Sequence, residues 1–163
     1  MLQAKKWKKR CVTTACCVHN FHQSIFIDRN SGGKTFRDIV ASAGIKIVLH
    51  DDIFKNDTPD EDWLKEVATL GHVVVTGDKD VTHRLLFLKQ LVASKAYVFI
   101  LYGLNGASPQ GKAGCVLSAI DKITELMKSG EPPALWKIGK DNRTANRCDH
   151  EKILARMYAN RRG

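Results

Sequence analysis

The sequence predicts an α/β domain, with a parallel sheet of about five strands and helices on both faces. Two observations predict this fold. Short apolar segments alternate with longer segments whose apolar residues recur at helical spacing. The short segments are apolar at successive positions, which is typical of strands that are covered on both faces. Because strands that alternate with helices form parallel sheets, the order of the segments predicts the fold class.

The predicted strands are rich in β-branched and aromatic residues. They are residues 24–27, 45–49, 73–76, 97–101 and 135–138. An acidic or glycine-containing segment follows each of the first and third strands: Asp28 after the first, and Gly77 and Asp78 after the third. These positions are turns at strand ends, where binding and catalytic residues are often found.

The predicted helices are stretches whose apolar residues fall on one face. They run from Phe36 to Ala43, from Trp63 to Leu70, from Val81 to Val92 and from Ala113 to Met127. A glycine follows three of them, at positions 44, 71 and 130, where helices commonly end. A last amphipathic helix is predicted around Ile153, Leu154 and Met157.

The basic character of the chain lies at its two ends. The net charge is +9, of which residues 1–22 carry +5 and residues 140–163 carry +4. We therefore predict a basic N-terminal extension (1–22), one α/β domain (23–139) and a basic, helical C-terminal tail (140–163). Lysines and arginines beside an acidic site suit a polyanionic substrate, because they bind phosphates. The alternative is a solvated surface that aids solubility.

Cysteine usage and hydropathy indicate where the protein acts. Five cysteines without framework spacing argue against a disulfide scaffold and fit a reducing compartment. No apolar run reaches the ~18 residues that a membrane span needs. The basic start of the chain is not followed by the apolar stretch of a secretory signal. We expect a cytoplasmic protein that does not enter the membrane.

Two aspartates are expected at one edge of the sheet. Asp28 ends the first strand and Asp78 follows the third. Right-handed crossovers place both strand ends at the same edge, where ligands bind in open parallel sheets. Carboxylates that converge there repel one another unless a cation is present, and hard oxygen ligands select Mg²⁺ or Mn²⁺.

A third acid is expected from the start of the second predicted helix. Asp60 lies on the same helix face as Leu64 and Val67, so the face that packs on the sheet carries this carboxylate at its leading end. Metal ligation and first-turn electrostatics are both open for Asp60. Glu61 has a structural alternative, since Thr58-Pro59-Asp60-Glu61 has the pattern of a capping box.

Two of these acids also have ordinary structural interpretations. Asp28 is at a position where turn aspartates are common, and its pairing with Asp78 favours the functional interpretation. Asp80 is either a fourth metal ligand or the N-cap of the helix that begins near Val81. The sequence leaves that choice open.

Three segments in order carry a resemblance to a known family. They are residues 25–29 (Ile-Phe-Ile-Asp-Arg), 60–64 (Asp-Glu-Asp-Trp-Leu) and 75–80 (Val-Thr-Gly-Asp-Lys-Asp). Together they resemble the short PIN-like domains allied to VapC-type toxins of bacterial toxin–antitoxin pairs. The resemblance covers residues 24–139 and implies a Mg²⁺- or Mn²⁺-dependent endoribonuclease.

The resemblance also implies roles for particular residues. Asp28 and Asp78 correspond to the family's invariant acids, and the catalytic, metal-binding acid from the helix is Asp60 or its neighbour. Thr76 matches the hydroxyl that steadies the metal site. Asp80 is expected as a further metal ligand and Glu61 as a supporting residue. The resemblance implies an RNA substrate and a cognate antitoxin that blocks the site. A homodimer is possible, and the sequence leaves the oligomeric state open.

One departure from the family pattern keeps a second hypothesis open. Family members often carry another acid near the third helix or after the fourth strand, whereas this chain has Lys89-Gln90 and an acid-free segment 102–110 there. The alternative is a PIN-like module that binds nucleic acid or protein without catalysis.

Overall fold

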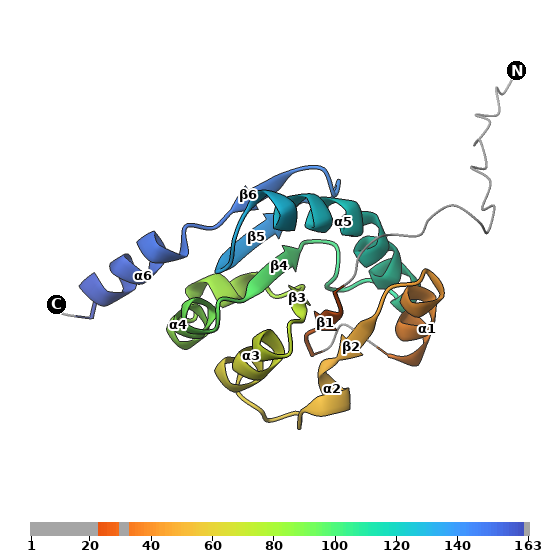
Figure 1. Cartoon of the computed structure of the whole chain (residues 1–163), viewed down its shortest axis with the longest axis horizontal. Coiled ribbons are helices and arrows are strands. Elements are labelled where there is room, and N and C mark those ends of the chain that lie inside the picture. The colour runs from red at the N-terminus through yellow and green to blue at the C-terminus, as the bar shows by residue number, and fades with distance from the viewer. Residues whose placement is uncertain (1–22, 30–32, 162–163) are drawn as a thin grey trace, which may run out of the picture.

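The computed structural model describes residues 23–29 and 33–161 of the chain (Figure 1). The predicted N-terminal extension, residues 1–22, lies outside the described residues. The elements follow one another as β1 (Ile25–Ile27), α1 (Lys34–Ser42), β2 (Ile47–Leu49), α2 (His50–Ile53), α3 (Asp60–Thr69), β3 (Val73–Thr76), the 3₁₀-helix η1 (Lys79–His83), α4 (Leu85–Ser94), β4 (Tyr97–Leu101), α5 (Pro109–Ser129), β5 (Ala134–Ile138), β6 (Ala145–Arg147) and α6 (His150–Ala159).

The sheet has the strand order β2-β1-β3-β4-β5-β6. Strands β1 to β5 are parallel to their neighbours, and β6 is antiparallel to β5. The five parallel strands confirm the predicted fold class. Because they are parallel, their carboxyl ends lie at one edge of the sheet, which is where Asp28 and Asp78 follow β1 and β3.

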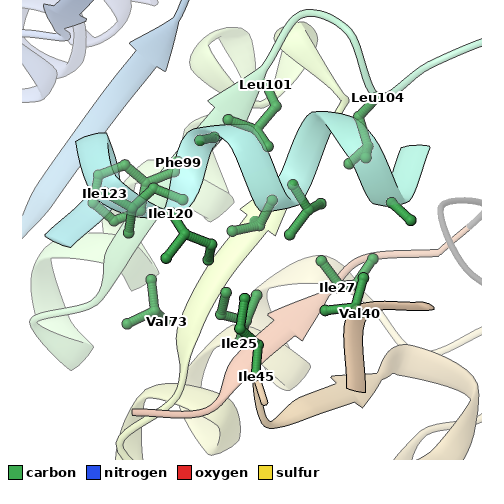
Figure 2. Close-up of a cluster of buried hydrophobic side chains, with 14 of the residues drawn as sticks. Ile25, Ile27, Val40, Ile45, Val73, Phe99, Leu101, Leu104, Ile120 and Ile123 are labelled. Carbon is green, nitrogen blue, oxygen red and sulfur yellow. The ribbon is translucent and has the colours of Figure 1, made fainter. Parts of the chain in front are cut away.

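Helices cover both faces of the sheet, as predicted (Figure 1). Side chains of one strand alternate between the faces, so Ile25 and Ile27 of β1 pack under α1 and α5, whereas Phe26 packs under α3 and α4. Figure 2 shows the first of these layers, with Ile120 and Ile123 of α5 above the sheet. Each buried side chain of this size contributes roughly 1.5–3 kcal/mol to folding.

The sheet extends beyond residue 139, where the sequence analysis placed the end of the domain. Strand β6 pairs with β5, and the Cys148 N–H donates to the Leu135 carbonyl at 2.8 Å. The predicted C-terminal helix exists as α6, and its residues Ile153, Leu154 and Met157 pack against the cluster under α3 and α4. Residues 145–159 are therefore part of the same folded body.

Two further elements differ from the prediction. The helix predicted from Val81 to Val92 is divided into η1 and α4, and Val92 is 39% exposed instead of joining the apolar face. Residues 50–53 form the short helix α2, which the sequence analysis did not predict. Within the described residues, no helix is both long and apolar enough to cross a membrane.

Candidate active site

Strand register brings Asp28 and Thr76 together. Ile27 of β1 is opposite Val75 of β3, so the next positions along both strands, Asp28 and Thr76, are neighbours. Both lie on the side of Phe26 and Val74, which is the face that α3 and α4 cover. The Thr76 hydroxyl donates a hydrogen bond to Asp28 Oδ2 at 3.0 Å. The backbone geometry of two strands thus orients this carboxylate.

The buried Thr76 hydroxyl also connects Asp28 to Asp78. The Asp78 N–H donates to Thr76 Oγ1 at 3.0 Å, so the hydroxyl acts as donor on one side and acceptor on the other. Asp78 Oδ1 in turn accepts from the Asp80 N–H at 2.8 Å and caps η1. The interpretation of Asp80 as a helix cap is therefore wrong, because the cap is Asp78.

The third carboxylate comes from the first turn of α3. Asp60 is only 15% exposed, and its Oδ1 accepts from Trp63 Nε1 at 3.1 Å. Trp63 is fully buried, so its indole holds the carboxylate from beneath. Leu64 and Val67 pack in the cluster on the sheet, so Asp60, which shares their helix face, lies on the sheet side as expected.

The predicted capping box at the start of α3 is wrong. The N-cap residue is Pro59, and no side chain caps the helix. Thr58 lies one residue too early, where its carbonyl accepts from Arg29 Nη2 at 3.0 Å. Glu61 forms no hydrogen bond or ion pair with any other described residue, so the structural role assigned to it is also absent.

A pocket of about 340 Å³ joins these groups at the carboxyl edge of the sheet. The lining residues are Asp28, Arg29, Asp60, Thr76, Gly77, Asp78, Arg84 and Asn105. Four of the six predicted site residues are therefore brought together. Asp80, which is exposed, and Glu61 do not line the pocket.

Two arginines that the sequence analysis did not predict share the pocket with the acids. Arg84 Nη2 contacts Asp78 Oδ2 at 2.7 Å, and its Nη1 contacts Asp60 Oδ2. Arg29 Nη2 contacts Asp60 Oδ1 at 3.0 Å. Among the residues that the structure describes, no three His, Cys, Asp or Glu side chains form a group that could hold a metal ion. Guanidinium groups form ion pairs with two of the three carboxylates, Asp60 and Asp78.

Asn105 is the other residue that the sequence analysis missed. It comes from the loop after β4, in the acid-free segment 102–110, and its Nδ2 donates to the Gly77 carbonyl at 2.7 Å. A Cβ at position 77 would lie 2.3 Å from Asn105 Oδ1, so Gly77 allows this close approach. A parallel sheet brings the end of β4 to the same edge as the ends of β1 and β3. The position of Asn105 after β4 could therefore have predicted that it lies near the pocket.

The pKa of Asp28 is raised above its ordinary value, chiefly because burial disfavours the charged form. The hydrogen bonds from Thr76 and from the Arg29 N–H oppose this shift, and the nearby Asp60 carboxylate adds to it. A carboxylate held partly out of water beside a second acid is a feature of functional sites.

Comparison with known proteins identifies the family. Residues 24–103 match a family model described as PIN like domain. Neither the curated proteins nor the solved structures include a significant match to this chain. The matched segment contains β1 to β4 and every residue that lines the pocket except Asn105. The segment 24–103, with its parallel strands and its acids at the carboxyl edge, belongs to the PIN-like domain family.

Proposed function

We propose that this chain is an endoribonuclease that depends on Mg²⁺ or Mn²⁺. The observation that carries the proposal is the convergence of Asp28, Asp60 and Asp78 in one pocket, from three elements far apart in the sequence. Membership of the PIN-like family supports a nuclease-type fold.

The donor chemistry of the pocket fits a hard divalent cation. Asp28, Asp60 and Asp78 supply carboxylate oxygens, the ligands that Mg²⁺ and Mn²⁺ prefer. Because the three side chains do not form a group that could hold a metal in this structure, they would hold the ion only after a rearrangement of the pocket. Such an ion would neutralise charge that develops on a phosphodiester and activate water. Arg29 and Arg84 partly neutralise the same carboxylates, so a cation would share or replace these contacts.

Other groups of the chain would position the acids and the substrate. The Thr76 hydroxyl orients Asp28 through Oδ2, and the Arg29 N–H holds Oδ1 at 2.6 Å. Trp63 fixes Asp60 in the same way. Because these donors are backbone groups or buried side chains, the carboxylates are held in place before a substrate arrives. The basic residues beyond 139 would attract RNA phosphates.

The proposal extends to the biological role of a toxin in a toxin–antitoxin pair. It rests on the resemblance of residues 25–29, 60–64 and 75–80 to VapC-type proteins. Expression of the chain in a bacterial host should then arrest growth, and Asp28→Asn should relieve the arrest. Growth arrest that survives this substitution would argue against a toxic ribonuclease.

A second candidate, a PIN-like binding module without catalysis, is favoured by one observation. Asp60 and Asp78 already have guanidinium partners, and Asn105 takes a place where family members often have an acid. A pocket whose carboxylates are permanently paired with arginines would bind no cation.

An RNA cleavage assay separates the two candidates. Purified full-length protein is incubated with single-stranded RNA and Mn²⁺, with and without EDTA, beside Asp28→Asn. We expect cleavage that EDTA and the substitution both abolish. Cleavage that resists EDTA and persists in Asp28→Asn would indicate a contaminating nuclease, and no cleavage under any condition would favour the binding module.

A further inference from the structure

Arg84 makes an unusual bridge in the candidate site. Its two terminal nitrogens contact carboxylates from different elements, Asp60 on α3 and Asp78 after β3. A guanidinium is a planar fork that can contact two acceptors at once, which a lysine cannot do in the same way. The bridge therefore ties together two of the three acids that would hold a cation.

The main chain and the side chain of Arg84 have different surroundings. Its main chain joins η1 to α4, where its N–H donates to the Val81 carbonyl at 3.3 Å and its carbonyl accepts from the Leu88 N–H at 3.0 Å. Its side chain is 47% exposed. The side chain can therefore turn towards solvent without disturbing either helix.

Arg29, the other arginine of the pocket, is anchored differently. Its guanidinium also donates to the carbonyls of Asn56 and Thr58, so it has main-chain partners besides Asp60. The Arg84 guanidinium has the carboxylates of Asp60 and Asp78 as its acceptors among the described residues. Of the two arginines, Arg84 is the one whose contacts lie entirely at the acids.

We propose that Arg84 is an internal counter-ion that competes with a divalent cation for Asp60 and Asp78. The inference rests on the proposed function, because it concerns the same three carboxylates. Arg84 occupies Oδ2 of both acids and carries a positive charge that repels a second cation. Cation binding thus includes the release of Arg84, and the arginine lowers the apparent metal affinity of the pocket.

Mn²⁺ binding to full-length protein in the absence of RNA tests this inference. Free Mn²⁺ is measured by its electron paramagnetic resonance signal during titration of wild type, Arg84→Met and Arg84→Lys. We expect Arg84→Met to bind Mn²⁺ about tenfold more tightly, since two partly exposed ion pairs no longer compete with the cation. Arg84→Lys keeps the charge but loses the fork, so its affinity should lie between the other two.

Arg37→Met is the matched control. Arg37 forms an ion pair with Asp52 of α2 at similar exposure, 41% and 39%, and neither residue lines the pocket. Arg37→Met should lower the melting temperature of the metal-free protein, and so should Arg84→Met. Arg37→Met should, however, leave the Mn²⁺ affinity at the wild-type value. Only the variant at position 84 should combine lower metal-free stability with tighter Mn²⁺ binding.

The possible outcomes separate this inference from the proposed function. Mn²⁺ binding of equal or lower affinity in Arg84→Met overturns the role of Arg84 and leaves the metal site standing. A gain of affinity in Arg37→Met as well overturns it too, because the effect would be one of general charge. Should Arg84→Met fail to fold, Arg84→Lys decides by the same criterion. No Mn²⁺ binding by any variant overturns both the inference and the metal-dependent function.

Discussion

Asp149 and Asp60 both lie at the start of a helix, Asp149 as the N-cap of α6 and Asp60 as the first residue of α3, and their carboxylates have different partners. Asp149 caps its own helix, since its Oδ1 accepts from the Lys152 N–H at 2.9 Å. Asp60 starts α3 but leaves the helix without a side-chain cap, and its oxygens accept from Trp63, Arg29 and Arg84. An acid that pairs with guanidinium groups from other segments, instead of capping its own helix, is a stronger functional candidate than an acid at a helix start alone.

The largest effect is expected at Asp28, which shares the pocket with Asp60. Its carboxylate accepts from the Thr76 hydroxyl and feels the charge of Asp60. Asp28→Asn should abolish RNA cleavage, because it removes an anionic oxygen from the proposed cation site. Without metal, the free energy of unfolding at neutral pH should stay the same or rise slightly, because the burial penalty on the charge disappears. Cleavage at the wild-type rate would reduce Asp28 to a turn residue.

The pH dependence of stability gives Asp28 a second test. The pKa of Asp28 in the folded state is raised above 3.8, the ordinary value that it has in the unfolded state. At pH values between the unfolded and the folded pKa, the folded state therefore binds more protons than the unfolded state. Wild-type stability should therefore fall as pH rises through this window, and the loss should be complete above the raised pKa. Urea unfolding midpoints of wild type and Asp28→Asn are measured from acid to neutral pH. The wild-type midpoint should fall relative to that of Asp28→Asn as pH rises through this window.

Asp60→Asn and Asp149→Asn compare the two helix starts directly. Asp60→Asn should lower the cleavage rate on the order of a hundredfold, as the loss of a metal ligand does. Asp149→Asn should retain full activity and nearly full stability, because asparagine caps helices as well as aspartate does. Equal activity of the two variants would remove the distinction between the two acids.

Asp149→Ala should affect stability and not activity. Loss of the cap of α6 should cost about 1 kcal/mol in the free energy of unfolding. Because α6 packs on the cluster under α3 and α4 through Ile153 and Leu154, the cost should appear in the global transition. Urea denaturation measures it, and a parallel cleavage assay checks that the pocket is unaffected.

The smallest effect is expected at Glu61, beside Asp60 on α3. Its carboxylate has no hydrogen-bonding partner among the described residues and does not line the pocket. Glu61→Gln should therefore leave the cleavage rate unchanged. It should change the free energy of unfolding by no more than ~0.5 kcal/mol. A dead Glu61→Gln with an active Asp60→Asn would move the third acid by one residue.

The parts of the site that could be predicted follow from simple periodicities. Asp28 and Thr76 continue two strands in register, and a period of two places both on the face of Phe26. Asp60 follows from the helical spacing of Leu64 and Val67. The alternation along a strand and the spacing along a helix are local properties of the chain. They can therefore be recognised in the sequence alone.

The parts that could not be predicted depend on contacts between elements. Arg84 reaches the acids because the chain turns between η1 and α4, but Val81 and Leu88 keep a helical spacing across that break and conceal it. Strand β6, Ala-Asn-Arg, has no buried residue and so lacks the apolar signal of a strand; its pairing with β5 forms it. The capping box failed because the helix begins at Asp60 instead of one residue earlier.

Thermal unfolding of wild type and Asp28→Asn, each with and without Mn²⁺, tests the central claim most directly. A cation that binds the folded pocket raises the melting temperature, by an amount that grows with the logarithm of its concentration relative to its dissociation constant. We predict that Mn²⁺ stabilises the wild-type protein and leaves Asp28→Asn unchanged. Equal stabilisation of both proteins, or of neither, would contradict a metal-dependent carboxylate site in this pocket.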